Sequence, residues 1–273
     1  MDMKRTPHHD ILGDHVETDK HVLEGTRSAG GFRGDVAFVG QEAGDLDQGV
    51  CRMAEAVCAP KAIELKDVDG KLWLTLDRGR CIMCGLCEEA APEVFKLQSK
   101  YAQPVRSKSE LVVARLDDKT PGAPDHSREE LGRRLSEKIA KVVGRSLAIR
   151  EVDAGSCNGC EVEVAALNNA IYDIERFGVH FVASPRHADV LLVTGVGSRN
   201  MESALRRTYD AAPDPKVVVA VGACACTGGV FGDTYATSGG IGNIVPVDVC
   251  VPGCPPRPEA LLYALLLAVD RIQ

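Results

Sequence analysis

Residues 151–163 read EVDAGSCNGCEVE and place Cys157 and Cys160 in a glycine-bearing loop between an apolar run and an amphipathic run. Two further cysteines also follow apolar runs. Cys224 lies in VGACACTGG after KVVVAV, and Cys254 lies in VPGCPPRP after IVPVDVCV. If the apolar runs are strands, three strand ends bring four thiols to one place. Four converging thiolates bind either an iron–sulfur cube or a zinc ion, and this pattern leaves both open.

Strands and helices are predicted to alternate from residue 147 onward. Apolar runs typical of buried strands occupy residues 147–152, 179–183, 189–195, 216–222 and 243–251. Helical patterns are expected over residues 162–177, 198–210 and 259–271. The alternation predicts an α/β domain over residues 147–273, with a doubly wound parallel sheet and helices on both faces. Sites in such sheets form outside the carboxyl ends of the strands, where these four cysteines fall.

A second cysteine motif lies upstream of this domain, at Cys81, Cys84 and Cys87. Its C-x2-C-x2-C spacing, followed by Pro92, is the run of bacterial ferredoxins, with Ala91 in place of the fourth cysteine. In two-cluster ferredoxins the fourth cysteine of each run ligates the other cluster. The fourth ligand of the cluster at Cys81, Cys84 and Cys87 would therefore come from a first run further upstream.

A degenerate first run ends at Cys58, and its other positions are Gln48, Cys51 and Ala54. The cluster that would need Gln48, Cys51, Ala54 and Ala91 has lost three of its four ligands. The other cluster would need Cys58 and the triplet, and it has kept all four. Cys51 then belongs only to the ligand set that has been lost, and we expect it to be buried.

Residues 32–97 are therefore predicted to form a small α+β ferredoxin-like domain that keeps one [4Fe-4S] cluster, held by Cys58, Cys81, Cys84 and Cys87. A structural zinc site is the alternative, although zinc sites more often use two separated CxxC pairs. Residues 1–31 are expected to be a polar tail. Residues 98–146 are expected to be a linker and a basic amphipathic helix, which Ser127 caps.

The overall composition restricts partners and location. The formal net charge of −7 shows no basic excess, which argues against nucleic acid as a partner. Eleven cysteines, an odd number in CxxC-type spacings, indicate metal ligation in a reducing compartment. No secretory signal is visible, and the apolar run within residues 260–269 is too short to span a bilayer. We expect a cytoplasmic protein that reaches the inner face of a membrane through partner subunits.

Four segments, taken in order, resemble the small subunit of the [NiFe] hydrogenases of the formate hydrogenlyase and energy-converting type. They are VDAGSCNGCEVE (152–163), ASPRHADVLLVTG (183–195), APDPKVVVAVGAC (212–224) and IVPVDVCVPGCPPRPE (244–259). That subunit is in turn similar to the 20 kDa cluster-bearing subunit of respiratory complex I. The resemblance covers residues 147–273. It implies a flavodoxin-like fold and a [4Fe-4S] cluster held by Cys157, Cys160, Cys224 and Cys254.

Several features depart from the pattern of these relatives. Complex I subunits carry adjacent cysteines at the first site, whereas Cys157 and Cys160 are spaced as in the hydrogenase branch. Cys226 and Cys250 are additional cysteines that could compete as ligands. We retain Cys224, because its Gly-x-Cys context matches the family, and expect Cys226 and Cys250 to be packed thiols. The fused ferredoxin-like domain resembles part of a separate two-cluster partner subunit.

Three charged or titratable residues have two interpretations each. Arg186 and His187 precede the strand at 189–195 and could lie at the cluster edge, where their charge would raise its potential. They could equally be a helix-capping or subunit-interface pair. Glu161 follows the second ligand and could carry protons or contact a partner. An exposed glutamate in the first turn of a helix is the alternative.

The resemblance implies electron relay. A donor iron–sulfur subunit or ferredoxin would reduce the ferredoxin-like cluster, the second cluster would follow, and a [NiFe] centre in a separate large subunit would receive the electrons. The chain has no pair of CxxC motifs of the large-subunit kind, one ending D-P-C-x-x-C, so it should catalyse nothing alone. Two alternatives remain. One is a quinone-linked, complex I-like subunit, and the other is a redox sensor or zinc scaffold without a catalytic partner.

Overall fold

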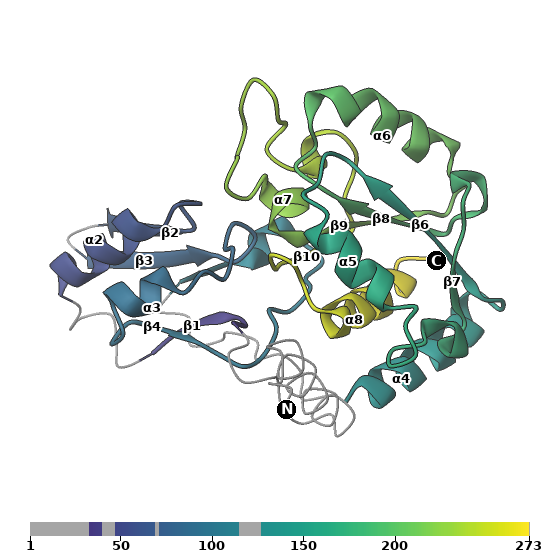
Figure 1. Ribbon diagram of the computed structural model, residues 1–273, viewed down its shortest axis with the longest axis horizontal. Coiled ribbons are helices and arrows are strands. Elements are labelled where there is room, and N and C mark those ends of the chain that lie inside the picture. Colours follow the sequence, from purple (N-terminus) through teal and green to yellow (C-terminus); the bar gives the residue numbers. More distant parts are fainter. Residues whose placement is uncertain (1–32, 40–46, 69–70, 115–126, 273) are drawn as a thin grey trace, which may run out of the picture.

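The computed structural model describes residues 33–39, 47–68, 71–114 and 127–272, which form two lobes (Figure 1). The smaller lobe contains the elements up to β5, and the larger lobe contains those from α4 onward. The predicted tail at 1–31 lies outside the described residues.

The smaller lobe combines two antiparallel sheets with two helices. One sheet pairs β1 (Val36–Phe38) with β4 (Phe95–Leu97). The other has the order β2 (Ile63–Val68), β3 (Lys71–Asp77), β5 (Val112–Ala114). The two helices, which contact each other, are α2 (Gln48–Val57) and α3 (Leu86–Ala90). β5, preceded by the 3-10 turn η2 (Lys108–Leu111), extends this lobe beyond residue 97, into the segment expected to be a linker.

The larger lobe is built on a five-stranded parallel sheet. Its strands in spatial order are β10 (Val249–Val251), β9 (Val217–Val221), β8 (Val190–Thr194), β6 (Leu147–Asp153) and β7 (Val179–Phe181). All four neighbouring pairs are parallel. Counted along the chain from β6, this is the 2-1-3-4-5 order of flavodoxin-like folds, so the predicted α/β class is confirmed.

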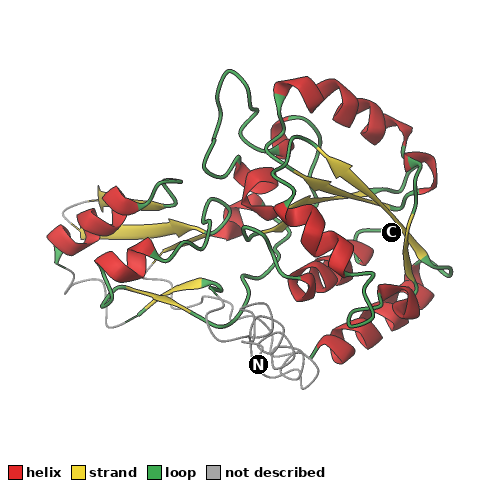
Figure 2. Ribbon diagram, in the orientation of Figure 1, coloured by secondary structure: helices red, strands yellow, loops and turns green. Residues whose placement is uncertain are grey.

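Helices cover both faces of this sheet (Figure 2). One face packs against α4 (Arg128–Val142), α5 (Gly159–Ala166) and α8 (Pro258–Val269). The other packs against α6 (Arg199–Ala211) and α7 (Gly222–Thr227). Neighbouring side chains alternate between the faces, because successive residues of a strand point to opposite sides. Leu192 and Val219 lie in the first core, and Leu191 and Val218 lie in the second.

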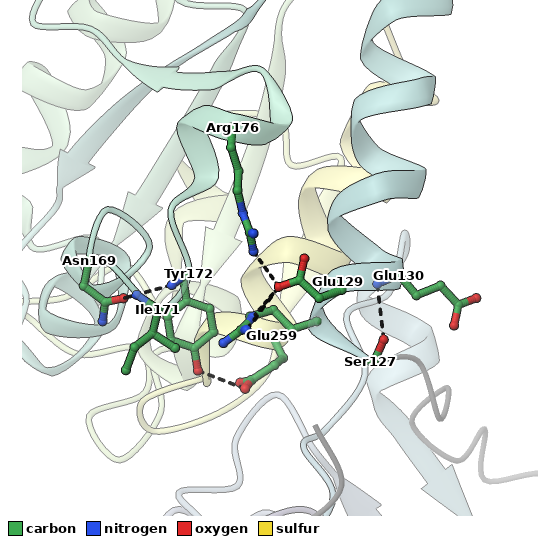
Figure 3. Close-up of polar contacts among 9 residues, drawn as sticks. Ser127, Glu129, Glu130, Asn169, Ile171, Tyr172, Arg176 and Glu259 are labelled. Atoms are coloured by element: carbon green, nitrogen blue, oxygen red, sulfur yellow. Dashed lines mark hydrogen bonds and ion pairs between the residues drawn. The ribbon is translucent and has the colours of Figure 1, made fainter. Parts of the chain in front are cut away.

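The helix predicted over residues 162–177 is interrupted. α5 ends at Ala166, and a 3-10 turn, η3, occupies Ile174–Phe177. Between them the Asn169 side chain accepts hydrogen bonds from the backbone amides of Ile171 (2.8 Å) and Tyr172 (2.9 Å) (Figure 3). An asparagine side chain that binds nearby amides competes with helical hydrogen bonds, which explains why the prediction was wrong here.

α4 begins as its sequence predicts and is tied to the larger lobe at its first turn. The Ser127 hydroxyl accepts a hydrogen bond of 3.2 Å from the Glu130 amide. The Arg176 guanidinium, on η3, donates to the Glu129 carboxylate at 2.6 Å (Figure 3). Leu135, on the predicted apolar face, is fully buried. These contacts place α4 against α8, at the edge of the sheet core.

Candidate metal centres

The four cysteines predicted to act together in the smaller lobe surround one cavity. Cys58 caps the carboxyl end of α2, and Cys87 lies in α3. Cys81 and Cys84 lie in the loop between β3 and α3. All four line the same cavity, whose other walls include apolar side chains such as Val36. The structure therefore brings Cys58, the residue that follows α2, to the triplet, as the ferredoxin spacing predicts.

Burial and the neighbouring thiols make two of these cysteines, Cys81 and Cys87, hard to ionise on their own. Burial raises the pKa of Cys81 to about 12, and the neighbouring Cys87 and Cys58 raise it as well. Burial, and then Cys84, raises the pKa of Cys87 to about 11. A cationic group bound among them would replace the protons, because metal ligation requires thiolates and releases their protons. The donor set therefore fits a metal-containing group.

Backbone amides are aimed at two of these sulfurs. The Ala62 amide donates to Cys58 Sγ at 3.2 Å, and the Met83 amide donates to Cys81 Sγ at 3.4 Å. Met83 has a φ of 56°, a left-handed conformation that is uncommon outside glycine. Hydrogen bonds to ligand sulfurs stabilise added negative charge and help set the potential of an iron–sulfur cluster.

Three of the four positions of the lost second cluster are now part of the apolar core. Cys51, Ala54 and Ala91 are each fully buried in the apolar core of the smaller lobe. Gln48 is exposed at the start of α2. The prediction that Cys51 is buried is confirmed.

The second group of four cysteines gathers at the carboxyl ends of the parallel strands. Cys157 follows β6, Cys160 lies in the first turn of α5, Cys224 lies in α7 after β9, and Cys254 follows β10. Burial raises the pKa of Cys224 to about 11, and Cys254 and Cys157 add to the rise. Burial, Glu161 and the other three thiols raise the pKa of Cys160. These mutual effects show that the four thiols lie close together.

Gly222 makes room for this group. It has a φ of +86°, and a Cβ built on it would lie 2.6 Å from Cys160 Sγ. A side chain at this position would therefore be strained in its backbone and would also collide with the sulfur. The glycine lets the start of α7, which carries Cys224, approach α5 closely.

Among the described residues, no group of three or more His, Cys, Asp or Glu side chains is arranged to hold a metal ion. A zinc site of that kind needs sulfurs about 2.3 Å from one shared ion. A cube places a different demand on the protein, because its four thiolates bind four different irons. Each of the two sets of four cysteines supplies the four thiolates that an iron–sulfur cube needs.

The two lobes meet between the two groups of cysteines. The Thr227 hydroxyl, three residues after Cys224, donates a hydrogen bond of 2.7 Å to the Gly79 carbonyl, two residues before Cys81. A Cβ built on Gly79 would lie 2.9 Å from Thr227 and 2.7 Å from Leu111. The lobes are therefore in close contact at this point.

Arg186 and His187 do not lie beside the cysteines. They form the 3-10 turn η4 (Pro185–His187), which precedes β8 and so lies at the amino end of that strand. There they line a cavity of about 530 Å³ with Arg145, His180 and Asp189. The expectation that they lie at the cluster edge is wrong, because the cysteines follow the carboxyl ends of the strands.

Glu161 does remain close to Cys160, since it contributes to the raised pKa of that thiol. Both of its carboxylate oxygens are buried, and neither has a hydrogen-bond partner among the described residues. It lines a cavity with Glu151, Asn158 and the exposed Val162. The interpretation as an exposed first-turn glutamate is therefore wrong.

Family models match two parts of the chain. Residues 157–268 match the family described as NADH ubiquinone oxidoreductase, 20 Kd subunit. Residues 74–127 match the family described as 4Fe-4S single cluster domain. The second match contains the triplet at 81, 84 and 87 but begins after Cys58.

Individual relatives support the first match. The chain is 46% identical over 145 residues to the probable membrane-bound hydrogenase subunit mbhJ of Pyrococcus furiosus, covering 53% of this chain and 86% of the relative. It is 46% identical over 139 residues to formate hydrogenlyase subunit 7 of Escherichia coli, covering 51% of this chain and 54% of the relative. It is 51% identical over 113 residues to one of the subunits of the NADH-quinone oxidoreductase of Citrifermentans bemidjiense, covering 41% and 66%. The chain thus spans about half the length of the Escherichia coli relative.

The 4Fe-4S domain and the relatives, which are subunits of hydrogenase and NADH-quinone oxidoreductase complexes, define the class of protein as an iron–sulfur subunit of an oxidoreductase complex. The chain belongs to the family of the 20 kDa subunit of NADH ubiquinone oxidoreductase, whose members here include subunits named for hydrogenase and formate hydrogenlyase. The resemblance drawn from the sequence is confirmed. In the described part of the chain, no helix has both the length and the apolar character needed to cross a membrane.

Proposed function

We propose that this chain relays electrons through two [4Fe-4S] clusters to or from a [NiFe] active site in a separate large subunit. The proposed ligands are Cys58, Cys81, Cys84 and Cys87 in the smaller lobe, and Cys157, Cys160, Cys224 and Cys254 in the larger lobe. One observation supports this most strongly. Eight of the eleven cysteines gather into two groups of four, in two lobes that contact each other.

Each bound cluster would supply one-electron oxidation and reduction. The chain provides the conditions for it. The amides of Ala62 and Met83 donate to ligand sulfurs, and the apolar walls around the first group exclude water. Such burial and hydrogen bonding set the potential at which an electron is accepted. The contact of Thr227 with Gly79 holds the two lobes together, so that electrons can pass from one to the other.

The larger lobe presents a surface suited to the large subunit. Cys157 and Cys254 are exposed, in contrast to the buried Cys81 and Cys87 of the smaller lobe. Val162 lies two residues after Cys160 and is 60% exposed. A partner that covers this surface would bury apolar area and shield the second group of thiols from water.

The smaller lobe would receive electrons from a donor iron–sulfur subunit or a soluble ferredoxin. Leu86 lies between Cys84 and Cys87 and is 43% exposed. An exposed apolar side chain within the ligand run offers a contact for such a donor close to the first group. We place the assembled complex in the cytoplasm at the inner face of the membrane, held there by other subunits.

A quinone-linked, complex I-like role is the second candidate. The match of residues 157–268 to the 20 kDa subunit family favours it, as does the identity to the NADH-quinone oxidoreductase of Citrifermentans bemidjiense. Against it stands the spacing of Cys157 and Cys160, which resembles the hydrogenase branch. A redox sensor or zinc scaffold without a catalytic partner would need none of the exposed surface around Val162.

Isolation of the native complex through a tag on this chain tests the proposal. We expect a large subunit with two CxxC pairs, one ending D-P-C-x-x-C, together with nickel and hydrogen-dependent reduction of a viologen dye. A large subunit without those pairs and without nickel would support the quinone-linked role. Isolation of the chain alone with zinc would contradict electron relay.

Two matched variants test the docking surface. Val162→Glu places a charge beside the second group of cysteines and should release the large subunit. Val112→Glu changes a valine of similar exposure on β5, in the other lobe, and should leave the complex intact. If both variants retain the large subunit equally, its docking surface lies elsewhere.

A further inference from the structure

Two cysteines outside the proposed ligand sets come together under α7. Cys226 lies in α7, and its Sγ is 3.6 Å from the carbonyl oxygens of both Ala220 and Val251. Ala220 is the cross-strand partner of Cys250 in the pairing of β9 with β10. The side chains of Cys226 and Cys250 both belong to the core on this face of the sheet and line the same cavity. Two thiols that are distant in the sequence are thus neighbours on one face of the sheet.

Both thiols are buried, yet they line a cavity. Cys226 is 4% exposed and Cys250 is 5% exposed. They form part of the wall of a cavity of about 290 Å³, together with Arg106 and Lys108 from the segment that leads to β5. A cavity of this size admits water and small solutes of similar size. The pair is therefore protected from large reagents but is within reach of small ones.

We propose that Cys226 and Cys250 form a redox-active thiol pair that a hydroperoxide oxidises to a disulfide. One thiolate attacks the hydroperoxide, the O–O bond breaks, and a sulfenic acid forms as water or an alcohol leaves. The second thiol attacks that sulfenic sulfur, the S–S bond forms, and a second water leaves. In total the two thiols lose two electrons and two protons, which reduce the hydroperoxide.

The surroundings of the pair assign the two roles. The neighbouring Cys226 thiol and the positive charge of Lys108, which lines the same cavity, both lower the pKa of Cys250. Because the thiolate is the nucleophile, Cys250 is the residue that attacks the hydroperoxide. Cys226 lines the same cavity beside it and resolves the sulfenic acid.

The position of the pair gives the disulfide a structural consequence. It would join α7, which carries Cys224, to β10, which leads into the loop of Cys254. The bond would therefore clamp together two of the three elements that hold the second group of cysteines. This inference does not depend on the metal content of that group.

The test uses the full chain, purified anaerobically with its metal content intact. The chain is titrated with hydrogen peroxide, the remaining thiols are alkylated in denaturant, and disulfide-linked peptides are identified by mass spectrometry. Iron content is measured at each dose. Wild type, Cys226→Ser and Cys51→Ser are compared, the last being a buried cysteine in the other lobe.

We expect a linked peptide pair containing Cys226 and Cys250 at doses that leave the iron content unchanged. Dithiothreitol should reverse the link, Cys226→Ser should abolish it, and Cys51→Ser should retain it. The proposal is overturned if both residues remain alkylated until iron is lost, or if they link to Cys224 or Cys254 instead. The wild-type result decides the matter even if Cys226→Ser fails to fold.

Discussion

The hydroxyl of Thr227 lies 2.7 Å from the carbonyl oxygen of Gly79 and donates a hydrogen bond to it across the boundary between the lobes. Thr227 is buried, so this bond forms away from water. Each partner is within three residues of a proposed ligand, Cys224 on one side and Cys81 on the other. The contact therefore connects the backbones of the two candidate sites.

Thr227→Val should weaken this contact while keeping the shape of the side chain. The carbonyl of Gly79 would lose a buried donor, and we expect the free energy of unfolding to fall by about 1–3 kcal/mol. Magnetic coupling between the two reduced clusters, measured by electron paramagnetic resonance, should weaken as the lobes separate. Thr208→Val is the control, since the Thr208 hydroxyl bonds to the Ala204 carbonyl of its own helix. Equal effects of the two variants would contradict the role of the contact.

Gly222→Ala should remove the metal from the larger lobe. Its Cβ would meet Cys160 Sγ at 2.6 Å, so the sulfur must move. We expect a loss of about four irons per chain. Gly144→Ala is the matched control, because Gly144 also has a positive φ, +69°, but has no atom within 4 Å of an added Cβ. Both variants carry backbone strain of about 1–2 kcal/mol, and Gly222→Ala alone should lose iron.

Cys58→Ala and Cys51→Ala distinguish the retained ligand set from the discarded one. Cys58 lines the cavity of the triplet, whereas Cys51 is packed in the core. Cys58→Ala should lose about four irons per chain, and Cys51→Ala should keep its iron. Iron analysis of both proteins checks this. Retention of all iron in Cys58→Ala would show that the fourth ligand of the smaller lobe is wrongly assigned.

Removing one partner of the buried ion pair of Asp35 with Arg78 should cost far more stability than breaking a surface pair. The two groups lie 2.7 Å apart, and both side chains are buried. Burial raises the pKa of Asp35 to about 6, against the opposing charge of Arg78. Asp35→Ala would leave a buried charge unpaired, at a cost of about 3–5 kcal/mol.

The exposed pair of Arg133 and Glu137 provides the control for that comparison. Glu137→Ala should change the free energy of unfolding by no more than about 0.5 kcal/mol, because exposed pairs are screened by water and salt. Chemical denaturation of both variants measures the difference. Similar losses in the two would contradict the account of the buried pair.

The strands of the larger lobe could be predicted because buried parallel strands are continuous apolar runs. Residues 217–221, VVVAV, are buried throughout, and β9 has those bounds. The order of the strands came from the family resemblance, since periodicity does not specify which strands pair. β5 was missed because it is three residues long and depends on its pairing with β3.

In the candidate sites too, contacts that follow from motif spacing could be predicted, and contacts that depend on tertiary packing could not. The grouping of Cys58 with the triplet could be predicted because ferredoxin spacing encodes which cysteines share a cluster. The neighbourhood of Cys226 and Cys250 could not, because it depends on how α7 packs over β10. The position of Arg186 was available from the sequence, since a residue that precedes a parallel strand lies at its amino end.

The most direct test is the iron and acid-labile sulfide content of the anaerobically purified wild-type chain, together with its zinc content. Two groups of four cysteines that each hold a cube predict about eight irons and eight sulfides per chain. About four irons would mean that one of the two groups is wrongly assigned, and zinc in place of iron would contradict electron relay.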